Sequence, residues 1–149
     1  MKLSIVMMVK NEEKYLRECL EALRPLRKAV DSELIIVDTG SEDRTVEIAR
    51  QFTDKVYFHP WNNDFAAMRN KTIEYATGEW LLVLDGDEIL ADARGLIRFL
   101  KSPDSKKYKT GILTFRNITS LVDESAYITG YLPRLFRNEN FYYKGSIHE

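Results

Sequence analysis

The sequence predicts an α/β protein with a mainly parallel sheet, and two observations carry this prediction. Apolar segments typical of buried strands alternate with segments of helical periodicity along residues 1–90. An uninterrupted apolar run at 80–84 then passes directly into the acidic stretch 85–88. A strand that is apolar on both faces is typical of a parallel sheet, and ligands bind outside the carboxyl ends of such strands.

Length and composition are those of one globular domain. The chain has 149 residues, 44% hydrophobic and 30% charged, which suits one core and is too short for two ordinary domains. A net charge of −1 gives no reason to expect nucleic acid as a partner. The single cysteine, Cys19, excludes an internal disulfide and favours a reducing, cytoplasmic location. No apolar run approaches the roughly 20 residues of a membrane span, and the N-terminus does not fit a signal peptide.

The first two strand–helix units are identified by their apolar runs and capping residues. Residues 3–9 are expected to form a strand, followed by a helix that Asn11 caps and Pro25 ends. Residues 34–37 predict the second strand, and Ser41 is expected to cap the helix after it.

A third unit completes the predicted parallel sheet. A short strand at 56–58 leads to a helix that Asp64 caps and that Gly78 ends in the left-handed conformation. The strand that begins at Trp80 is the fourth. Three strand–helix repeats and a fourth strand predict right-handed crossovers, with helices on both faces of the sheet.

Beyond residue 90 the pattern changes to a mixed β extension. Asp92 is expected to cap a helix that Pro103 ends. Residues 111–119 and 125–137 are then expected to form antiparallel strands.

The acidic stretch after the fourth strand predicts a divalent cation. Asp85, Asp87 and Glu88 would repel one another unless a positive charge lies between them. Mg²⁺ or Mn²⁺ prefers oxygen ligands and often uses one or two carboxylates together with substrate phosphates. Asp85 and Asp87 are the candidate ligands, and Glu88 is expected to be a solvated neighbour. The alternative is an acidic surface turn.

Other candidate residues lie at the same edge of the predicted sheet. Asp38 ends the second strand and could accept a hydrogen bond from a base or a ribose, or it could serve only the Asp-Thr-Gly turn. Lys10 and Asn11, at the tip of the first strand, could line a base pocket. Arg69 could pair with Asp38 or reach a diphosphate, or it could be a solvated helix arginine. The sequence contains neither common glycine-rich phosphate motif, so phosphate charge would be met by Arg69 and a metal.

Together these residues resemble the family 2 glycosyltransferases, which have the GT-A fold. The resemblance rests on four segments in the family's order and spacing: SIVMMVKNEEKYLRECLEAL, IIVDTGSEDRT, AAMRN and GEWLLVLDGDEIL. The match at the end of the chain, YYKGSIHE, is looser. The resemblance implies one GT-A-like domain over 1–149, with a nucleotide-sugar-binding half at 1–90 and the start of an acceptor half at 91–149.

The resemblance also implies a role for each candidate residue. Asp38 would contact the base of a UDP-sugar donor, and Asp85 would lie near the ribose. Asp87 would coordinate the Mg²⁺ or Mn²⁺ that bridges the diphosphate, with Arg69 holding the base-side pocket or the diphosphate. His148 is a candidate metal or phosphate ligand, and Glu149 is the candidate catalytic base.

The implied reaction is an inverting, in-line transfer of the sugar to an acceptor hydroxyl. The acceptor would be a carbohydrate, a lipid-linked sugar or a peptide, as in the synthesis of bacterial cell-envelope polysaccharide. The chain is expected to be a piece of a longer protein, inactive alone and located in the cytoplasm. A missing C-terminal part would then provide any peripheral contact with the inner face of the membrane.

Three other functions fit parts of the sequence. A phosphotransferase would use Asp85 as the nucleophile, although such acids usually follow the first strand. A sugar nucleotidyltransferase would need a glycine-rich, arginine-bearing loop where residues 9–12 read Val-Lys-Asn-Glu. A non-catalytic nucleotide-binding or interaction module is the third.

Overall fold

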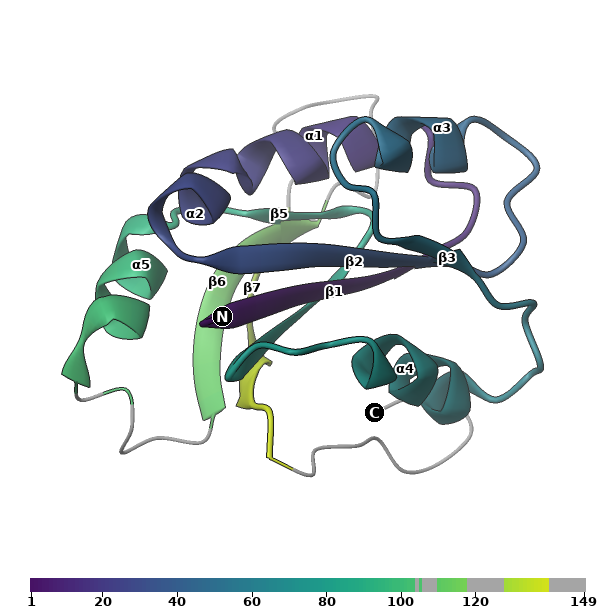
Figure 1. Cartoon of the computed structure of the whole chain (residues 1–149). Coiled ribbons are helices and arrows are strands. Elements are labelled where there is room, and N and C mark those ends of the chain that lie inside the picture. Colours follow the sequence, from purple (N-terminus) through teal and green to yellow (C-terminus); the bar gives the residue numbers. More distant parts are fainter. Residues whose placement is uncertain (104, 106–109, 118–127, 140–149) are drawn as a thin grey trace.

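The computed structural model describes residues 1–103, 105, 110–117 and 128–139. Its strands form one sheet in the order β3-β2-β1-β4-β7-β6-β5 (Figure 1). The strands are β1 (Leu3–Val9), β2 (Ser32–Asp38), β3 (Val56–Phe58), β4 (Trp80–Asp85), β5 (Glu88–Leu90), β6 (Thr110–Asn117) and β7 (Ile128–Arg137). The helices are α1 (Leu16–Ala22), α2 (Arg24–Ala29), α3 (Thr45–Arg50), α4 (Phe65–Glu74) and α5 (Arg94–Lys101).

The sheet has a parallel part and an antiparallel part, as the sequence predicts. β1 pairs in parallel with β2 on one side and with β4 on the other, so the strand order reverses at β1. β4 pairs antiparallel with β7, and β7, β6 and β5 continue antiparallel. The mixed β extension is therefore confirmed over 110–117 and 128–137, and the predicted strand ends at 118–119 and 125–127 lie outside the described residues. β5 is a strand that sequence analysis does not predict, because it has only three residues and the first of them, Glu88, belongs to the acidic stretch.

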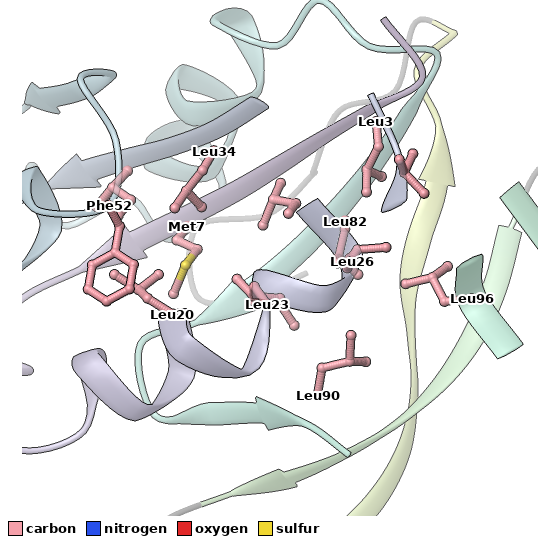
Figure 2. Packing of buried hydrophobic residues seen from close by; sticks show 14 of the residues in the cluster. Leu3, Met7, Leu20, Leu23, Leu26, Leu34, Phe52, Leu82, Leu90 and Leu96 are labelled. Atoms are coloured by element: carbon pink, nitrogen blue, oxygen red, sulfur yellow. The ribbon is translucent and has the colours of Figure 1, made fainter. Parts of the chain in front are cut away.

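Helices cover both faces of the sheet, and alternate strand residues pack against them. The larger core lies between one face and α1, α2, α3 and α5 and includes Met7, Leu20 and Leu82 (Figure 2). The smaller core lies on the other face, where Val6 and Val83 pack against α4. Successive strand side chains point to opposite faces, so the apolar side chains of β1 and β4 contribute to both cores.

Two predicted helix caps are wrong for one reason, which is that the side chain joins a loop instead. Asn11 lies in the left-handed region, with φ 52°, and α1 begins only at Leu16. Its side-chain oxygen accepts a hydrogen bond from the backbone N–H of Glu42, 2.8 Å away. Ser41 bonds Asp38, and α3 begins only at Thr45. Asparagine tolerates positive φ, and both side chains hydrogen-bond loop backbone as readily as a helix end.

The remaining predicted helix ends agree in part with the structure. Asp64 caps α4 as predicted, accepting from the backbone N–H of Ala67 at 3.1 Å. Pro25 does not end a helix but lies in the first turn of α2, where its missing N–H costs nothing. Asp92 accepts from the backbone N–H of Arg94 at 2.9 Å, although Ala93 occupies the N-cap position of α5. α5 ends at Lys101, before Pro103, as expected.

Gly78 is required by close packing, and the predicted left-handed conformation is wrong. Its φ is not positive, and Gly40, at φ 131°, is the positive-φ glycine among the described residues. A Cβ atom at Gly78 would lie 2.7 Å from the carbonyl carbon of Leu3 and from the backbone nitrogen of Ser4. The chain before β4 therefore lies directly against the start of β1.

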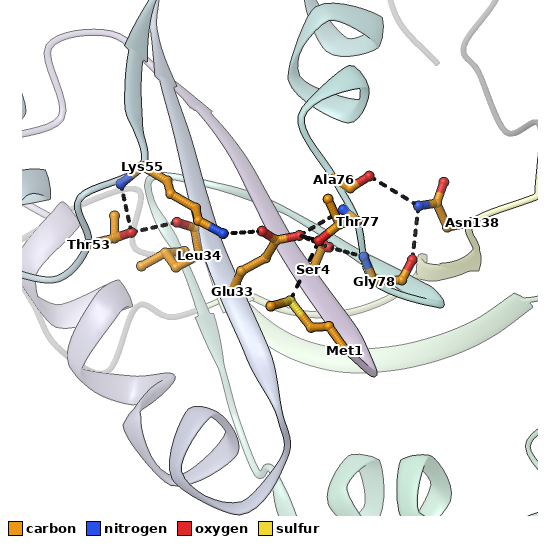
Figure 3. Close-up of polar contacts among 10 residues, drawn as sticks. All are labelled: Met1, Ser4, Glu33, Leu34, Thr53, Lys55, Ala76, Thr77, Gly78 and Asn138. Atoms are coloured by element: carbon orange, nitrogen blue, oxygen red, sulfur yellow. Dashed lines mark hydrogen bonds and ion pairs between the residues drawn. The ribbon is translucent and has the colours of Figure 1, made fainter.

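A buried carboxylate ties the amino ends of these strands together. Glu33, 3% exposed in its side chain, accepts hydrogen bonds from Ser4 Oγ at 2.5 Å and from both the N–H and hydroxyl of Thr77 at 2.8 Å (Figure 3). Lys55 Nζ lies 2.5 Å from its other oxygen. Burial disfavours the charged form, but the bonds from Lys55, Ser4 and Thr77 outweigh it and lower the pKa of Glu33 to about 2. This edge is structural, and it lies opposite the predicted site.

Candidate functional site

The candidate site lies where the strand order reverses, at the carboxyl ends of β2, β1 and β4. Asp38 ends β2 beside Val9, and Asp85 ends β4 beside Met8. The two acids therefore flank the tip of β1 at the same edge of the sheet. In open α/β sheets this reversal point is where ligands bind.

A hollow of about 260 Å³ opens beside the tip of β1. Its lining comes from β1, from the loop after it, from the end of β2 and from the loop after β3: Met8, Val9, Lys10, Glu12, Thr39 and Trp61. Lys10 thus lies where sequence analysis placed it. Asn11 is exposed and contributes to the loop that begins at Ser41 rather than to this lining. Sequence analysis missed Trp61 and Glu12; an aromatic residue in a polar loop was the available signal for Trp61.

Asp38 organises its own loop. It is 4% exposed, and its carboxylate accepts from the N–H groups of Gly40 at 3.2 Å and Ser41 at 3.1 Å. The hydroxyl of Ser41 donates to its other oxygen at 2.5 Å. This is the turn interaction that sequence analysis left open. A carboxylate has about four acceptor positions, so these three bonds leave about one of them unused.

Arg69 is buried and paired with Asp85, so the solvated-arginine alternative is wrong. α4 carries Arg69 under the end of β4, where its side chain is 2% exposed and Nη2 forms an ion pair with Asp85 Oδ1. The partner is Asp85 rather than the predicted Asp38. The ring of Phe65 lies 5.2 Å from the guanidinium carbon. Within the described part of the chain, Nε and Nη1 of Arg69 have no hydrogen-bond partner, which leaves two donors for an anion.

Glu88 is buried, so the prediction of a solvated neighbour is wrong. It is 2% exposed, and its Oε1 accepts from the backbone N–H of Asp85 at 2.7 Å, across the turn. Its Oε2 lies 3.2 Å from Nη2 of Arg134 on β7. Arg134 also lies 3.8 Å from Asp85 Oδ2. Sequence analysis did not single out Arg134, which is 46 positions from Glu88 and shares no motif with it.

α1 holds the turn from its other side. The thiol of Cys19 donates to the carbonyl oxygen of Gly86 at 3.1 Å. A Cβ atom at Gly86 would lie 2.9 Å from Cγ of Glu12, which explains glycine between the two aspartates. Glu12 therefore lies against the acidic turn, and its backbone N–H donates to the hydroxyl of Thr45 at 2.7 Å.

The electrostatics of the turn fit a cation. Burial, then the charge of Asp87, raises the pKa of Glu12 to about 7. Burial, then the charge of Asp85, raises the pKa of Glu88 to about 7, against the opposing charge of Arg134. The pKa of Asp87 is raised for the same two reasons, burial and Asp85. Negative charge here exceeds what Arg69 and Arg134 balance, and a divalent cation would relieve it.

The acidic side chains of the turn are candidates for a metal that is shared with a ligand. Among residues 1–103, 105, 110–117 and 128–139, no three His, Cys, Asp or Glu side chains are grouped so as to hold a metal by themselves. Mg²⁺ is commonly held by one or two carboxylates together with substrate phosphates. Asp87 and Asp85 can supply those carboxylates. His148 and Glu149 lie outside the described residues.

The arrangement is that of an open α/β protein whose ligand site lies where the strand order reverses, with a hollow and carboxylates beside it. The family described as glycosyl transferase family 2 matches residues 4–138. The chain belongs to glycosyl transferase family 2, and its fold is the GT-A fold. No helix in the described ranges is both long and apolar enough to cross a membrane.

Relatives and solved structures agree with this assignment. The SPbeta prophage-derived glycosyltransferase SunS of Bacillus subtilis is 35% identical over 152 aligned residues, covering 95% of this chain and 32% of SunS. A TPR repeat-containing protein of Synechococcus elongatus is 46% identical over 87 residues, covering 58% of this chain and 21% of that protein. The structure of S. aureus TarS 1-349 superposes with a TM-score of 0.56 at 28% identity, covering 67% of this chain and 32% of that one. The chain thus spans a third or less of these relatives.

Proposed function

We propose that this chain is the donor-binding part of a glycosyltransferase that uses a UDP-sugar and a divalent cation. The carrying observation is the pairing of Arg69 with Asp85 beside Asp87, at the point where the strand order reverses. TarS, the 28% identical neighbour, has been crystallised with UDP, and a further TarS structure at 25% identity contains UDP-GlcNAc. These complexes support a UDP-sugar as the donor.

Each residue has a proposed part in holding the donor. The hollow beside Lys10 would take the base, with Asp38 accepting a hydrogen bond from its N–H. Asp85 would lie near the ribose, where Arg69 keeps its carboxylate oriented. Nε and Nη1 of Arg69, for which the described residues provide no hydrogen-bond partner, would donate to the diphosphate.

Asp87, with Asp85, would hold the Mg²⁺ or Mn²⁺ against the diphosphate. A bound cation of this kind neutralises charge on a departing nucleoside diphosphate. His148 is proposed as an additional metal or phosphate ligand and Glu149 as the base that takes the acceptor proton in an inverting displacement. The acceptor, a carbohydrate, a lipid-linked sugar or a peptide, would be bound largely by the 91–149 half and by further parts of a longer protein. We propose that the transfer takes place in the cytoplasm. Any contact with the membrane face would be made by parts of the protein outside the described residues.

The test is calorimetric titration of the chain with UDP, with and without Mn²⁺. Binding is expected to need Mn²⁺ and to weaken at least tenfold in Asp87→Ala, since the ligand carboxylate is lost. Asp92→Asn removes the charge of an acid that lies beyond β5 and is expected to bind as the unchanged chain does. Metal-independent binding that survives in Asp87→Ala would exclude Asp87 as a ligand. Slow release of sugar from a UDP-sugar would favour an enzyme over a non-catalytic nucleotide-binding module.

A further inference from the structure

β7 contains a bulge beside the acidic turn. Along β6, Gly111 lies opposite Leu135 and the next residue, Ile112, lies opposite Pro133. One step on β6 therefore corresponds to two steps on β7, and Arg134 is the extra residue. Bulges of this kind re-aim a side chain and are frequent next to active sites.

The bulge directs Arg134 toward the turn between β4 and β5. Its side chain is 11% exposed, and Nη2 lies 3.2 Å from Glu88 Oε2 and 3.8 Å from Asp85 Oδ2. Glu88 in turn accepts the backbone N–H of Asp85 at 2.7 Å. A chain of contacts therefore runs from β7 through a buried carboxylate to the backbone at the start of the turn.

We propose that Arg134 is a positioning residue, which acts through Glu88 to fix the Asp85–Asp87 turn in the shape that binds a cation together with a diphosphate. The inference rests on the proposed function, because it assigns a role within the same site. It adds that the turn is held by a residue of the antiparallel extension, outside the proposed nucleotide-binding half 1–90.

The physical basis is the cost of a buried charge. Glu88 is nearly inaccessible to water, so removing the guanidinium leaves its carboxylate buried without that countercharge. Glu88 then turns toward water, and the N–H of Asp85 loses its acceptor. Asp87 lies only two residues further along, so its position relative to a diphosphate changes with the turn. In other metal sites, replacing a residue that hydrogen-bonds to a metal ligand typically lowers metal affinity about 10–100-fold.

The experiment compares two binding reactions in one set of variants. Uridine, titrated without metal, reports the base pocket, and the Mn²⁺ concentration for half-maximal UDP binding reports the turn. Arg134→Gln and Glu88→Gln are expected to raise that Mn²⁺ concentration roughly tenfold or more while uridine affinity stays within about twofold. Arg134→Lys keeps the positive charge but lacks the planar guanidinium group. Its Mn²⁺ requirement is therefore expected to lie between those of the unchanged chain and of Arg134→Gln.

The matched control is Arg137→Gln, on the same strand. Arg137 lies over the ring of Trp80 and donates to the backbone oxygen of Ser105 at 3.0 Å, away from the turn. This variant is expected to lower the melting temperature without changing the Mn²⁺ requirement. The double variant Arg134→Gln/Glu88→Gln is expected to need no more Mn²⁺ than the single variant with the higher Mn²⁺ requirement, because both substitutions act through one contact.

Each outcome has a defined meaning. If Arg134→Gln and Glu88→Gln lower only the melting temperature and keep the original Mn²⁺ requirement, the pair is merely structural and the inference is overturned. Equal losses of uridine and UDP affinity would overturn it as well. If Arg134→Gln does not fold, Arg134→Lys and Glu88→Gln decide by the same two measurements. Binding of UDP by the unchanged chain without any Mn²⁺ requirement would instead refute the proposed function.

Discussion

Arg69 is buried beneath the end of β4 and forms an ion pair with Asp85, whose side chain is 39% exposed. Two nitrogens of the buried Arg69, Nε and Nη1, have no acceptor among the described residues. The pair therefore leaves part of the hydrogen-bonding capacity of Arg69 unused within the described residues, as the proposed contact with a diphosphate requires. A buried arginine therefore holds the half-exposed carboxylate of Asp85 at the edge of the sheet.

Replacement of Arg69 is expected to affect binding more than stability. In Arg69→Met, Asp85 can hydrate, and the cost of two unsatisfied buried donors disappears, so the unfolding free energy should change by about 1 kcal/mol or less. Loss of charged hydrogen bonds worth about 1.5–3 kcal/mol should weaken UDP roughly ten- to hundredfold. Urea unfolding and calorimetry measure the two effects. Lys71→Met, on the same helix with a 53% exposed side chain, is the control and should change neither.

Asp38 is expected to serve both its loop and the base. Asp38→Ala should lose about 1–2 kcal/mol of unfolding free energy, since two backbone N–H groups lose their acceptor, and should weaken uridine with no diphosphate present. Ser41→Ala removes the two loop bonds of this hydroxyl, to Asp38 and from the backbone N–H of Asn11, but keeps the Asp38 carboxylate, and it should retain uridine affinity. Unchanged uridine affinity in Asp38→Ala, with UDP weakened, would show that Asp38 does not contact the base.

Gly78 and Gly95 form a matched pair for a packing test. Gly78→Ala places a methyl group against the backbone of Leu3 and Ser4 and should cost about 1–3 kcal/mol or more. Gly95, within α5, has no atom within 4 Å of its added Cβ, so Gly95→Ala should stabilise by about 0.5–1 kcal/mol through helix propensity. Urea unfolding of both variants is the measurement. A Gly78→Ala protein as stable as the unchanged chain would contradict the close approach.

Glu33 should make the unfolding free energy depend on pH in the acidic range. Its pKa is about 2 in the folded chain and 4.5 in the unfolded one, so its contribution is full above pH 4.5 and is lost as the pH falls toward 2. The shift corresponds to about 3 kcal/mol. Glu33→Gln should therefore be less stable than the unchanged chain at pH 7, with the difference shrinking below pH 4.5. A difference that stays constant from pH 7 to pH 3 would contradict the assignment.

The parallel half could be predicted because its signals are local. The apolar runs of β1 and β4 and the cap at Asp64 are properties of adjacent residues, and they led to the correct strands and edge. Asn11 could not be predicted, because its left-handed backbone depends on Glu42, 31 positions away. Glu88 was misplaced for the same reason. Whether an acid after a strand is solvated or buried depends on Arg134, and that contact exists only in the folded sheet.

The placement of β5 also has a consequence for how the protein folds. Only Gly86 and Asp87 separate β4 from β5 along the chain, yet β7 and β6 lie between those strands in the sheet. β5 pairs with β6, so it has no place until both later strands have joined β4. Pairings between such distant segments form slowly. We therefore expect the acidic turn to acquire its final shape only after β6 and β7 have joined β4, so a chain leaving the ribosome would form its parallel strands before this edge of the sheet is complete.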